Sequence, residues 1–455
     1  MTDQSDDQPR SIFSRLLAIF RPRRPRPAVV RPERDLQRET LRVQIDIIRR
    51  AFDEKVGVAV GRGDDEADAD FLFRPDHMLV RTSEREEVDR FFSERQETYR
   101  GSGDVVGEPV EGLSVYRLPP RRSDGVIDVL KTLDEMDREV REGLATPDHV
   151  LYVVGSLGKA CPATEPAPPP GSGPVPALSK NPGAGKGVRV SVVDTGWYPD
   201  AATDSDTPWL ATGVDGDVEQ VDPNDIHAYA GHGTFVAGVV RCLAPATEIE
   251  VEGFLTMGGA IYESEIAQQL NEAMLDWEDN PQLISISAGT HTRKNLPLMG
   301  FQALSLAEKL TEGDNAVLVV AAAGNDGNDV PFWPAAFDWV VSVGSLDADG
   351  RVSTFSNYGP WVDVYAQGSD LVNAFPTGSY VCKEADHQGE VRTFTGLAQW
   401  SGTSFATPVV TGAIAAYMSE HGVTARQARD ALVAAAPTKH DPTVGTYPTL
   451  GPPFV

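Results

Sequence analysis

The sequence predicts two folded units: a doubly wound α/β domain with a mainly parallel sheet, preceded by a smaller α+β domain. Three observations support this division. After residue 187, apolar runs rich in β-branched residues alternate with helical patterns, as in parallel sheets covered by helices. Before residue 155, two amphipathic helical patterns are interleaved with short strand patterns. Between them, residues 156–186 are dense in Pro, Gly, Ala and Ser, which predicts an exposed linker.

The composition argues against several classes of protein. The chain has 455 residues and a formal charge of −27, and so acidic a chain is not expected to bind nucleic acid. Its three cysteines, Cys161, Cys242 and Cys382, are far apart and form no C-x-x-C pair, so no zinc or redox motif is expected. The odd number of cysteines favours a reducing compartment. No apolar run approaches the length that spans a membrane.

Residues 1–35 are predicted to be a disordered, basic and Pro-rich tail. In the alternative interpretation, its apolar positions between Ile12 and Phe20 form a short amphipathic turn that makes weak contact with an anionic membrane surface. The apolar block Leu16–Phe20 is short and comes before the cluster Arg21–Arg26, which is the reverse of a secretory signal. We therefore expect a cytoplasmic rather than a secreted protein.

The smaller domain is predicted at residues 36–155, with its core at residues 71–155. A helix from Asp35 to about Glu54 precedes this core. Within the core the order of elements is β-α-β-β-α-β, the split-βαβ or ferredoxin-like arrangement. The strands are expected at 78–80, 105–106, 113–118 and 150–154, and the helices at 84–99 and 126–144. Many unrelated proteins use this arrangement, so it indicates no function by itself.

The larger domain is predicted at residues 187–437, followed by a C-terminal tail at 438–455. Its strands are expected at 188–193, 249–254, 283–287, 316–321 and 339–343, and its helices at 233–242, 262–277, 301–311 and 405–418. In such sheets, active residues gather at the carboxyl ends of the strands.

Two polar residues of this domain form a candidate pair. Asp194 ends a buried strand in the sequence Asp-Thr-Gly, where Gly196 permits a sharp turn; the alternative is a simple Asx-turn. His232 opens an apolar helix in Gly-His-Gly-Thr-Phe-Val-Ala-Gly. A buried carboxylate such as Asp194 would keep this imidazole basic and in one tautomer. His227 lies in an acidic loop and is interpreted as a surface residue.

Two further residues could complete a nucleophilic site. Ser404, in Gly-Thr-Ser-Phe-Ala-Thr-Pro, starts an apolar helix, and its hydroxyl would need a base and oxyanion donors to act as a nucleophile. The alternative is a helix start capped by Thr403 or Ser404. Asn325, in Ala-Ala-Gly-Asn, could donate from its amide, although the following Asp-Gly also fits a turn. The strand end at Ser287–Gly289 could offer backbone groups to an extended peptide.

Together, these motifs resemble those of the subtilisin-like serine peptidases. D-T-G, H-G-T-x-V-A-G, A-A-G-N and G-T-S-x-A-x-P occur in that order, and the resemblance covers about residues 186–437. It implies that Ser404 attacks the peptide carbonyl, that His232 takes its proton and that Asp194 orients the imidazole. It also implies an oxyanion hole made by Asn325 and the Ser404 N–H. The substrate-binding residues it implies are Ser287, Ala288, Gly289, Ala323 and Gly324.

The resemblance also gives the smaller domain a role. Members of the family often carry an N-terminal prodomain of split-βαβ topology, and residues 71–155 resemble it in element order and position. This implies a serine endopeptidase of proteins or peptides, made as a precursor with its own N-terminal domain as intramolecular inhibitor. Self-cleavage is then expected between Gly155 and Lys186. The alternatives are a catalytically silent or a permanently inhibited binding protein. An esterase is disfavoured, because Ser404 comes last and no G-x-S-x-G elbow surrounds it.

Other features are less informative. No cofactor is required and no metal is expected. Calcium sites occur in the family, but the acidic stretch between Asp194 and His232 contains no D-x-D-x-D-G loop, so a solvated loop is favoured. Tyr380–Trp400 is predicted to be an insertion beside the cleft that shapes specificity or acts as a lid. The small side chains of Ala288 and Ala321–Ala323 predict room for a sizeable apolar substrate side chain.

Overall fold

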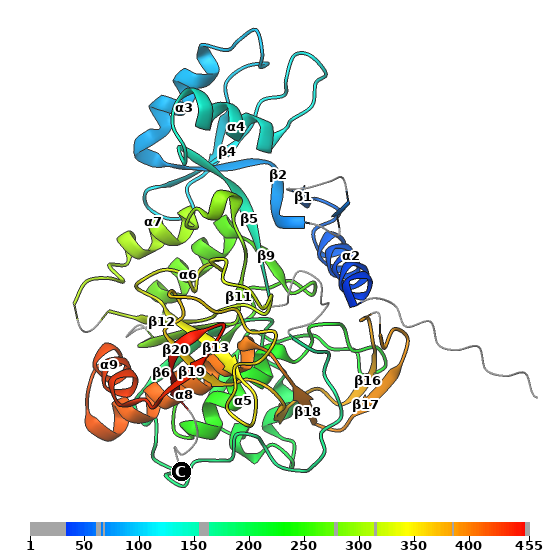
Figure 1. Ribbon diagram of the computed structural model, residues 1–455, viewed down its shortest axis with the longest axis vertical. Helices are drawn as coiled ribbons and strands as arrows, with labels where there is room; N and C mark the ends of the chain where they lie inside the picture. Colours follow the sequence, from blue (N-terminus) through cyan, green and yellow to red (C-terminus); the bar gives the residue numbers. More distant parts are fainter. Residues whose placement is uncertain are drawn as a thin grey trace, which may run out of the picture.

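The computed structural model describes residues 33–60, 65–66, 69–153, 163–276, 281–313, 316–384 and 386–450. Figure 1 shows an N-terminal module, residues 33–153, seated on a larger body, residues 163–450. The predicted basic tail lies outside the described residues, except for its last positions, which belong to a helix that begins at Glu33. Within the described ranges, no helix is long and apolar enough to cross a membrane.

The body contains a nine-stranded sheet with the strand order β19-β20-β14-β13-β12-β10-β6-β8-β7. All neighbouring strands are parallel except β19 and β20, which confirms the mainly parallel sheet. The strands are β6 (Arg189–Val193), β7 (Val214–Gly216), β8 (Glu248–Glu252), β10 (Leu283–Ile286), β12 (Leu318–Ala322), β13 (Val341–Leu346), β14 (Val364–Gln367), β19 (Thr438–Asp441) and β20 (Gly445–Leu450).

Helices cover both faces of this sheet, as the alternating pattern predicted (Figure 1). Helices α5, α8 and α9 contribute to the apolar cluster on one face, and α6 and α7 to the cluster on the other. Alternate residues of a strand point to opposite faces, so Val192 belongs to the first cluster and its neighbour Val193 to the second. The helices are α5 (His232–Leu243), α6 (Glu263–Asp276), α7 (Met299–Ala307), α8 (Thr403–His421) and α9 (Ala425–Ala435).

The module is built on an antiparallel sheet in which four strands follow the order β5-β2-β4-β3. Along the chain its elements are β2 (Ala69–Arg81), α3 (Arg85–Ser93), β3 (Asp104–Gly107), β4 (Leu113–Arg117), α4 (Val129–Glu139) and β5 (Ala145–Val153). Both helices are shorter than their sequence patterns suggested. Phe91 and Phe92 of α3 pack with Tyr99 and Tyr116 in a core separate from that of the body.

Two elements extend the module towards the body. Strand β1 (Gly57–Val60) pairs with β2, and helix α2 (Glu33–Ala51) lies beside it. Ile45 and Ile48 of α2 share a buried cluster with residues of β5 and of β9 (Ala260–Tyr262), a strand of the body. Helix α2 therefore packs against both parts of the molecule, a contact that its amphipathic pattern alone did not identify.

The exposed linker predicted at 156–186 is partly wrong for the part that the structure describes: positions such as Gly171–Gly173 are exposed, but the segment is docked on the body. Glu165 is buried and accepts hydrogen bonds from the Tyr380 hydroxyl, at 2.7 Å, and from the Lys383 backbone N–H. Ala167 forms an antiparallel bridge with Gln399, and Val175 with Val372. The segment is bound to the body mainly by backbone hydrogen bonds. Such bonds require no periodic apolar side chains, so no sequence pattern indicated them. Residues 154–162 lie outside the described residues.

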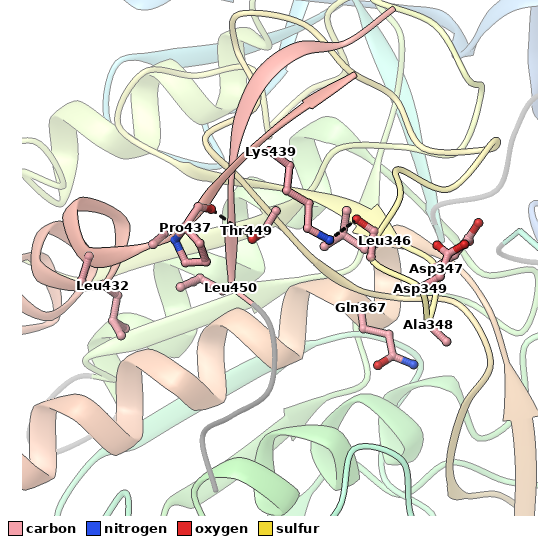
Figure 2. A pocket seen from close by; sticks show the side chains of 13 residues that line it. Leu346, Asp347, Ala348, Asp349, Gln367, Leu432, Pro437, Lys439, Thr449 and Leu450 are labelled. Atoms are coloured by element: carbon pink, nitrogen blue, oxygen red, sulfur yellow. Dashed lines mark hydrogen bonds between the residues drawn. The ribbon is translucent and has the colours of Figure 1, made fainter. Parts of the chain in front are cut away.

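The C-terminal tail predicted at 438–455 is also wrong for residues 438–450. Strand β20 adds to the main sheet beside β14, and the Tyr447 ring packs on Tyr365 at a centroid distance of 4.8 Å. The ammonium of Lys439 in β19 donates a hydrogen bond of 2.7 Å to the Gly350 carbonyl, and Figure 2 shows the Lys439 side chain beside Leu346. A cavity of about 490 Å³ lies beside this hairpin. Residues 451–455 are outside the described part of the chain.

The predicted insertion at Tyr380–Trp400 belongs to two small antiparallel pairs. Strand β16 (Gly378–Val381) pairs with β17 (Val391–Phe394), and β15 (Leu371–Ala374) pairs with β18 (Leu397–Trp400). Tyr380 and Phe394 are buried in the main core, so this end of the first hairpin is anchored to the body. Strand β18 leads directly into the turn that carries Ser404.

Candidate active site

Asp194 and His232 meet at the carboxyl edge of the main sheet. Asp194 follows β6 directly, and His232 is the first residue of α5; both side chains are fully buried. The His232 Nδ1 atom lies 2.7 Å from Oδ1 and 2.9 Å from Oδ2 of Asp194. A carboxylate can only accept here, so Nδ1 carries a proton, and in the neutral imidazole Nε2 is the acceptor. The structure thus brings the two predicted residues together.

Gly233 explains why the helix can approach so closely. A Cβ atom added at Gly233 would lie 2.5 Å from the carbonyl oxygen of Gly196 and 3.1 Å from the Asp194 Cβ. Gly196 itself has a φ of +111°, a conformation that glycine adopts without strain. Glycines at both positions therefore let the Asp-Thr-Gly turn and the start of α5 touch, which sets the distance between Asp194 and His232.

Ser404 is the second residue of α8 and is fully buried. The Ncap position is Gly402, which has no side chain to cap the helix, so the alternative of a Thr403 or Ser404 cap is wrong. The Ser404 Oγ and His232 Nε2 atoms are both buried without a hydrogen-bond partner among the described residues. The His232 ring also packs against Phe405, the residue after Ser404, at a centroid distance of 5.2 Å.

The Asn325 side chain is hydrogen-bonded to Thr403, the residue before Ser404. Its Oδ1 atom accepts hydrogen bonds from the backbone N–H and the hydroxyl of Thr403, both at 2.9 Å. The amide oxygen therefore faces Thr403, which turns the amide nitrogen to the other side. Asn357 supports the same loop: its amide donates to the Ala323 carbonyl at 2.9 Å, and its Oδ1 accepts from the Asp326 N–H.

The predicted substrate-binding strand end is paired with the module. Ala288 and Gly289 form β11, which pairs antiparallel with Val153 and Tyr152 at the end of β5. On its other side, β5 pairs antiparallel with β9. The Ser287 hydroxyl donates to the Ser404 carbonyl at 2.9 Å, so β11 leads towards Ser404. The described part of the module thus fills the groove between β9 and β11 with an extended strand.

Phe332 lies against the two glycines that follow Ala288 and Ala323, the residues from which room for a large substrate side chain was predicted. This ring is fully buried, and Cβ atoms added at Gly289 or Gly324 would collide with it or press on it. The expectation of room did not take Phe332 into account. It considered only the two strand ends and not the loop that folds back between them.

Comparison with known proteins identifies the family. A sequence model described as the subtilase family, Peptidase_S8, matches residues 185–447, which is more than half of the chain. The chain belongs to the subtilase family. The matched range contains Asp194, His232, Asn325 and Ser404, and it extends into the C-terminal hairpin, which sequence patterns predicted to be a tail.

Several characterised subtilases are similar to this chain. An intracellular serine protease of Paenibacillus polymyxa is 31% identical over 51% of this chain and 66% of that protein. A thermophilic serine proteinase of Bacillus sp. (strain AK1) is 31% identical over 54% of this chain and 55% of its own length. Thermitase of Thermoactinomyces vulgaris is 30% identical over 54% of this chain and 80% of its own. The alignments thus span less than two thirds of the first two relatives.

A solved structure of a cold adapted subtilisin-like serine proteinase aligns with a TM-score of 0.46 and 25% identity. That alignment covers 59% of this chain and 89% of the other.

Sequence patterns missed Glu219, which lies beside the site of this subtilase. Its side chain is buried and accepts a hydrogen bond of 2.8 Å from the N–H of Gly231, the residue before His232. Burial raises the pKa of Glu219 to about 8, although the Gly231 N–H opposes this shift. His227, interpreted as a surface residue, is instead largely enclosed beside Glu219, and burial lowers its pKa. Neither residue belongs to a recognisable motif.

The acidic stretch between Asp194 and His232 is held by local hydrogen bonds. Asp204 Oδ1 accepts from the Asp206 N–H, and Asp222 Oδ1 accepts from the Asn224 N–H, both at 2.8 Å. These are Asx-turn contacts of an irregular loop. In the part of the chain that the structure describes, no group of three or more His, Cys, Asp or Glu residues is placed to hold a metal ion.

Proposed function

We propose that this subtilase is a serine endopeptidase with Ser404 as its nucleophile. The observation that carries the proposal is the buried Asp194–His232 pair, whose imidazole packs on Phe405, together with a Ser404 hydroxyl that has no hydrogen-bond partner among the described residues. A buried serine with a structural role normally makes a hydrogen bond. A nucleophile needs instead a free hydroxyl near an imidazole that can accept its proton.

In the proposed reaction, His232 Nε2 takes the proton of Ser404 as Oγ attacks the carbonyl carbon of the substrate. Asp194 accepts from Nδ1–H and stabilises the imidazolium that forms. His232 then gives the proton to the leaving amine, and water attacks the acyl group on Ser404 by the same route. The Asn325 amide and the Ser404 N–H donate to the oxyanion; such donors act in the transition state, where charge develops.

We propose further that the module is of the ferredoxin-like, split-βαβ class and acts as an intramolecular inhibitor. Its strand β5 is paired on both sides, with Leu151 opposite Ile261 of β9 and Val153 opposite Ala288 of β11. These four side chains are buried in the apolar cluster of the body. A peptide substrate would need the same backbone edges, so it competes with β5 for the groove.

Self-cleavage is proposed between Val153 and Ala163, a narrower window than the one first expected from the sequence. Val153 ends the strand in the groove, and the Ala163 N–H donates to the carbonyl of Ser401 at 2.9 Å. These two residues lie on either side of the Ser404 turn. Residues after Ala163 remain bound along the body, because the Trp400 indole donates to the Thr164 carbonyl at 2.6 Å.

The proposal is tested with a serine-reactive fluorophosphonate and with casein as substrate. We expect the wild-type chain, activated by brief trypsin treatment if needed, to be labelled and to cleave casein. Ser404→Ala should do neither. Ser401→Ala serves as the matched control, because it removes a nearby buried hydroxyl and should leave both properties intact. Labelling of Ser404→Ala, or a wild-type chain that is neither labelled nor active after the module is digested, would contradict the proposal.

A further inference from the structure

The pairing of β5 with β11 has a defined register, which indicates where each residue of a substrate bound in the same groove would lie. Gly289 is opposite Tyr152 and Ala288 is opposite Val153, so the next substrate position lies opposite Ser287. Ser287 contacts Ser404 through a 2.9 Å hydrogen bond. An extended substrate that follows the path of β5 would therefore place the residue before the cleaved bond, P1, opposite Ser287.

The P1 side chain would point to the same face as Tyr152. Residues two apart in an extended strand share a face. The Tyr152 ring meets the ring of Phe332, with centroids 6.5 Å apart and planes at 73°. A P1 side chain is thus directed to the side of the groove where Phe332 lies, between the strand end at Gly289 and the loop at Gly324.

Phe332 already fills that space. The hypothetical Cβ at Gly289 would fall well inside van der Waals contact of its ring, and one at Gly324 would lie 3.1 Å from its Cγ. The ring therefore touches both walls of the slot. It is fully buried and shares a small apolar cluster with Ala322.

The Phe332 ring also packs against His291, which is itself bonded to Asp326. The His291 ring packs edge-on against Phe332 at a centroid distance of 5.2 Å, and His291 Nε2 lies 3.1 Å from Oδ2 of Asp326. Burial lowers the pKa of His291, but the Asp326 carboxylate outweighs this effect and raises it. Trp333, next to Phe332, exchanges two backbone hydrogen bonds with Thr290. These contacts fix the backbone next to Phe332 and the position of the His291 ring that packs on it.

We infer that Phe332 restricts P1 to small side chains such as Gly, Ala, Ser or Cys. The inference rests on the proposed function and adds the substrate class. The proposed self-cleavage window, between Val153 and Ala163, contains no aromatic residue; besides Val154, Leu157, Lys159 and Pro162 it holds the small residues Gly155, Ser156, Gly158, Ala160 and Cys161.

The test uses three peptides, acetyl-Leu-Tyr-Val-Xaa-p-nitroanilide with Xaa = Ala, Leu or Phe, which reproduce Leu151–Val153 of the strand in the groove. For the activated full-length chain, kcat/KM should be at least about tenfold higher for Ala than for Phe, the size of effect expected when a pocket lacks room. Phe332→Ala should lower this ratio at least about tenfold, mainly by improving the Phe peptide. Phe332→Leu, a milder change, should give an intermediate ratio.

Phe337→Leu is the matched control. Phe337 is a buried phenylalanine of the same loop that packs on Trp333, and it is not among the atoms nearest to a Cβ added at Gly289 or Gly324. Its substitution should leave the Ala/Phe ratio unchanged. A wild-type chain that cleaves the Phe peptide as well as the Ala peptide would overturn the inference, as would an active Phe332→Leu or Phe332→Ala chain with the wild-type ratio. If none of the peptides is cleaved and the fluorophosphonate does not label Ser404, the proposed function itself fails.

Discussion

Tyr152 of the N-terminal module lies opposite Gly289 of the body, in a strand that pairs on both sides with body strands. The pairing joins residues far apart in the chain. Strands β9 and β11 of the body thereby belong to the same sheet as the strands of the module. The groove that leads to Ser404 is filled by this extended strand of the same chain. On the proposed function, inhibition and recognition would use the same backbone edges, and a substrate would bind only after β5 has left.

Asn325→Ala is expected to lower kcat by about 10²- to 10³-fold, or about 3–4 kcal/mol in the transition state, with little change in KM. The amide nitrogen would act only once negative charge develops on the substrate oxygen. The measurement is steady-state hydrolysis of the Ala peptide.

Thr403→Ala tests the residue that positions the Asn325 amide, without removing the amide itself. It removes one of the two hydrogen bonds to Asn325 Oδ1 but keeps the amide nitrogen, so we expect a loss of less than about tenfold. An Asn325→Ala chain with a kcat close to that of the wild type would exclude the amide as an oxyanion donor.

Gly233→Ala should impair both the site and stability. The new methyl group would press on the Gly196 carbonyl and shift the start of α5, which carries His232. Overpacking of this kind typically costs about 1–3 kcal/mol. We expect a lower unfolding temperature and at least about tenfold slower fluorophosphonate labelling, since a small displacement of a catalytic group is costly.

Gly107→Ala is the control for this change, because a Cβ atom added there meets no atom within 4 Å. It should shift stability by less than about 0.5 kcal/mol. If Gly233→Ala and Gly107→Ala behaved alike in both measurements, the close approach of the Asp194 turn and α5 would not matter for the site.

The contact between module and body should weaken as pH rises. Asp148 of β5 is buried, and its carboxylate accepts from the N–H and hydroxyl of Ser264 at the start of α6. Burial raises the pKa of Asp148 to about 7, despite these hydrogen bonds and the nearby Arg74. Docking therefore favours the protonated acid. This contribution is complete below the pKa of the undocked carboxyl, about 4, and is lost as pH rises through 7.

Asp148→Asn mimics the neutral acid and should remove that dependence. At pH 8 the variant should release its module more slowly than the wild type, whereas at pH 5 the difference should be much smaller. The measurement is the lag before casein cleavage begins at each pH. Identical pH dependence of the lag in both chains would rule out Asp148 as the group responsible.

The residues of the site could be found from sequence because each stands in a short local pattern. Asp194 ends a strand, His232 opens a helix between glycines, and Ser404 follows a small-residue turn. Their convergence follows from the parallel sheet, whose strand ends share one edge. Local patterns therefore described most of the main fold and the four central residues.

What sequence patterns missed depends on contacts between distant segments. Phe332 reads as an ordinary apolar residue, and only the folded loop shows that it fills the slot between Gly289 and Gly324. Glu219 lies in an irregular polar loop, so nothing local indicated its burial beside Gly231. Strand β20 contains Pro448 and has only a short apolar pattern, so it was not predicted as a strand. It nevertheless joins the main sheet by pairing with β14.

The most direct test of the account is the intact mass of the purified wild-type chain beside that of Ser404→Ala. The account predicts that the wild type is cut once between Val153 and Ala163, which gives two fragments that stay associated, and that Ser404→Ala remains one uncut chain. Identical masses for the two proteins, whether both cut or both intact, would contradict the claim that Ser404 cleaves the strand that precedes it in the groove.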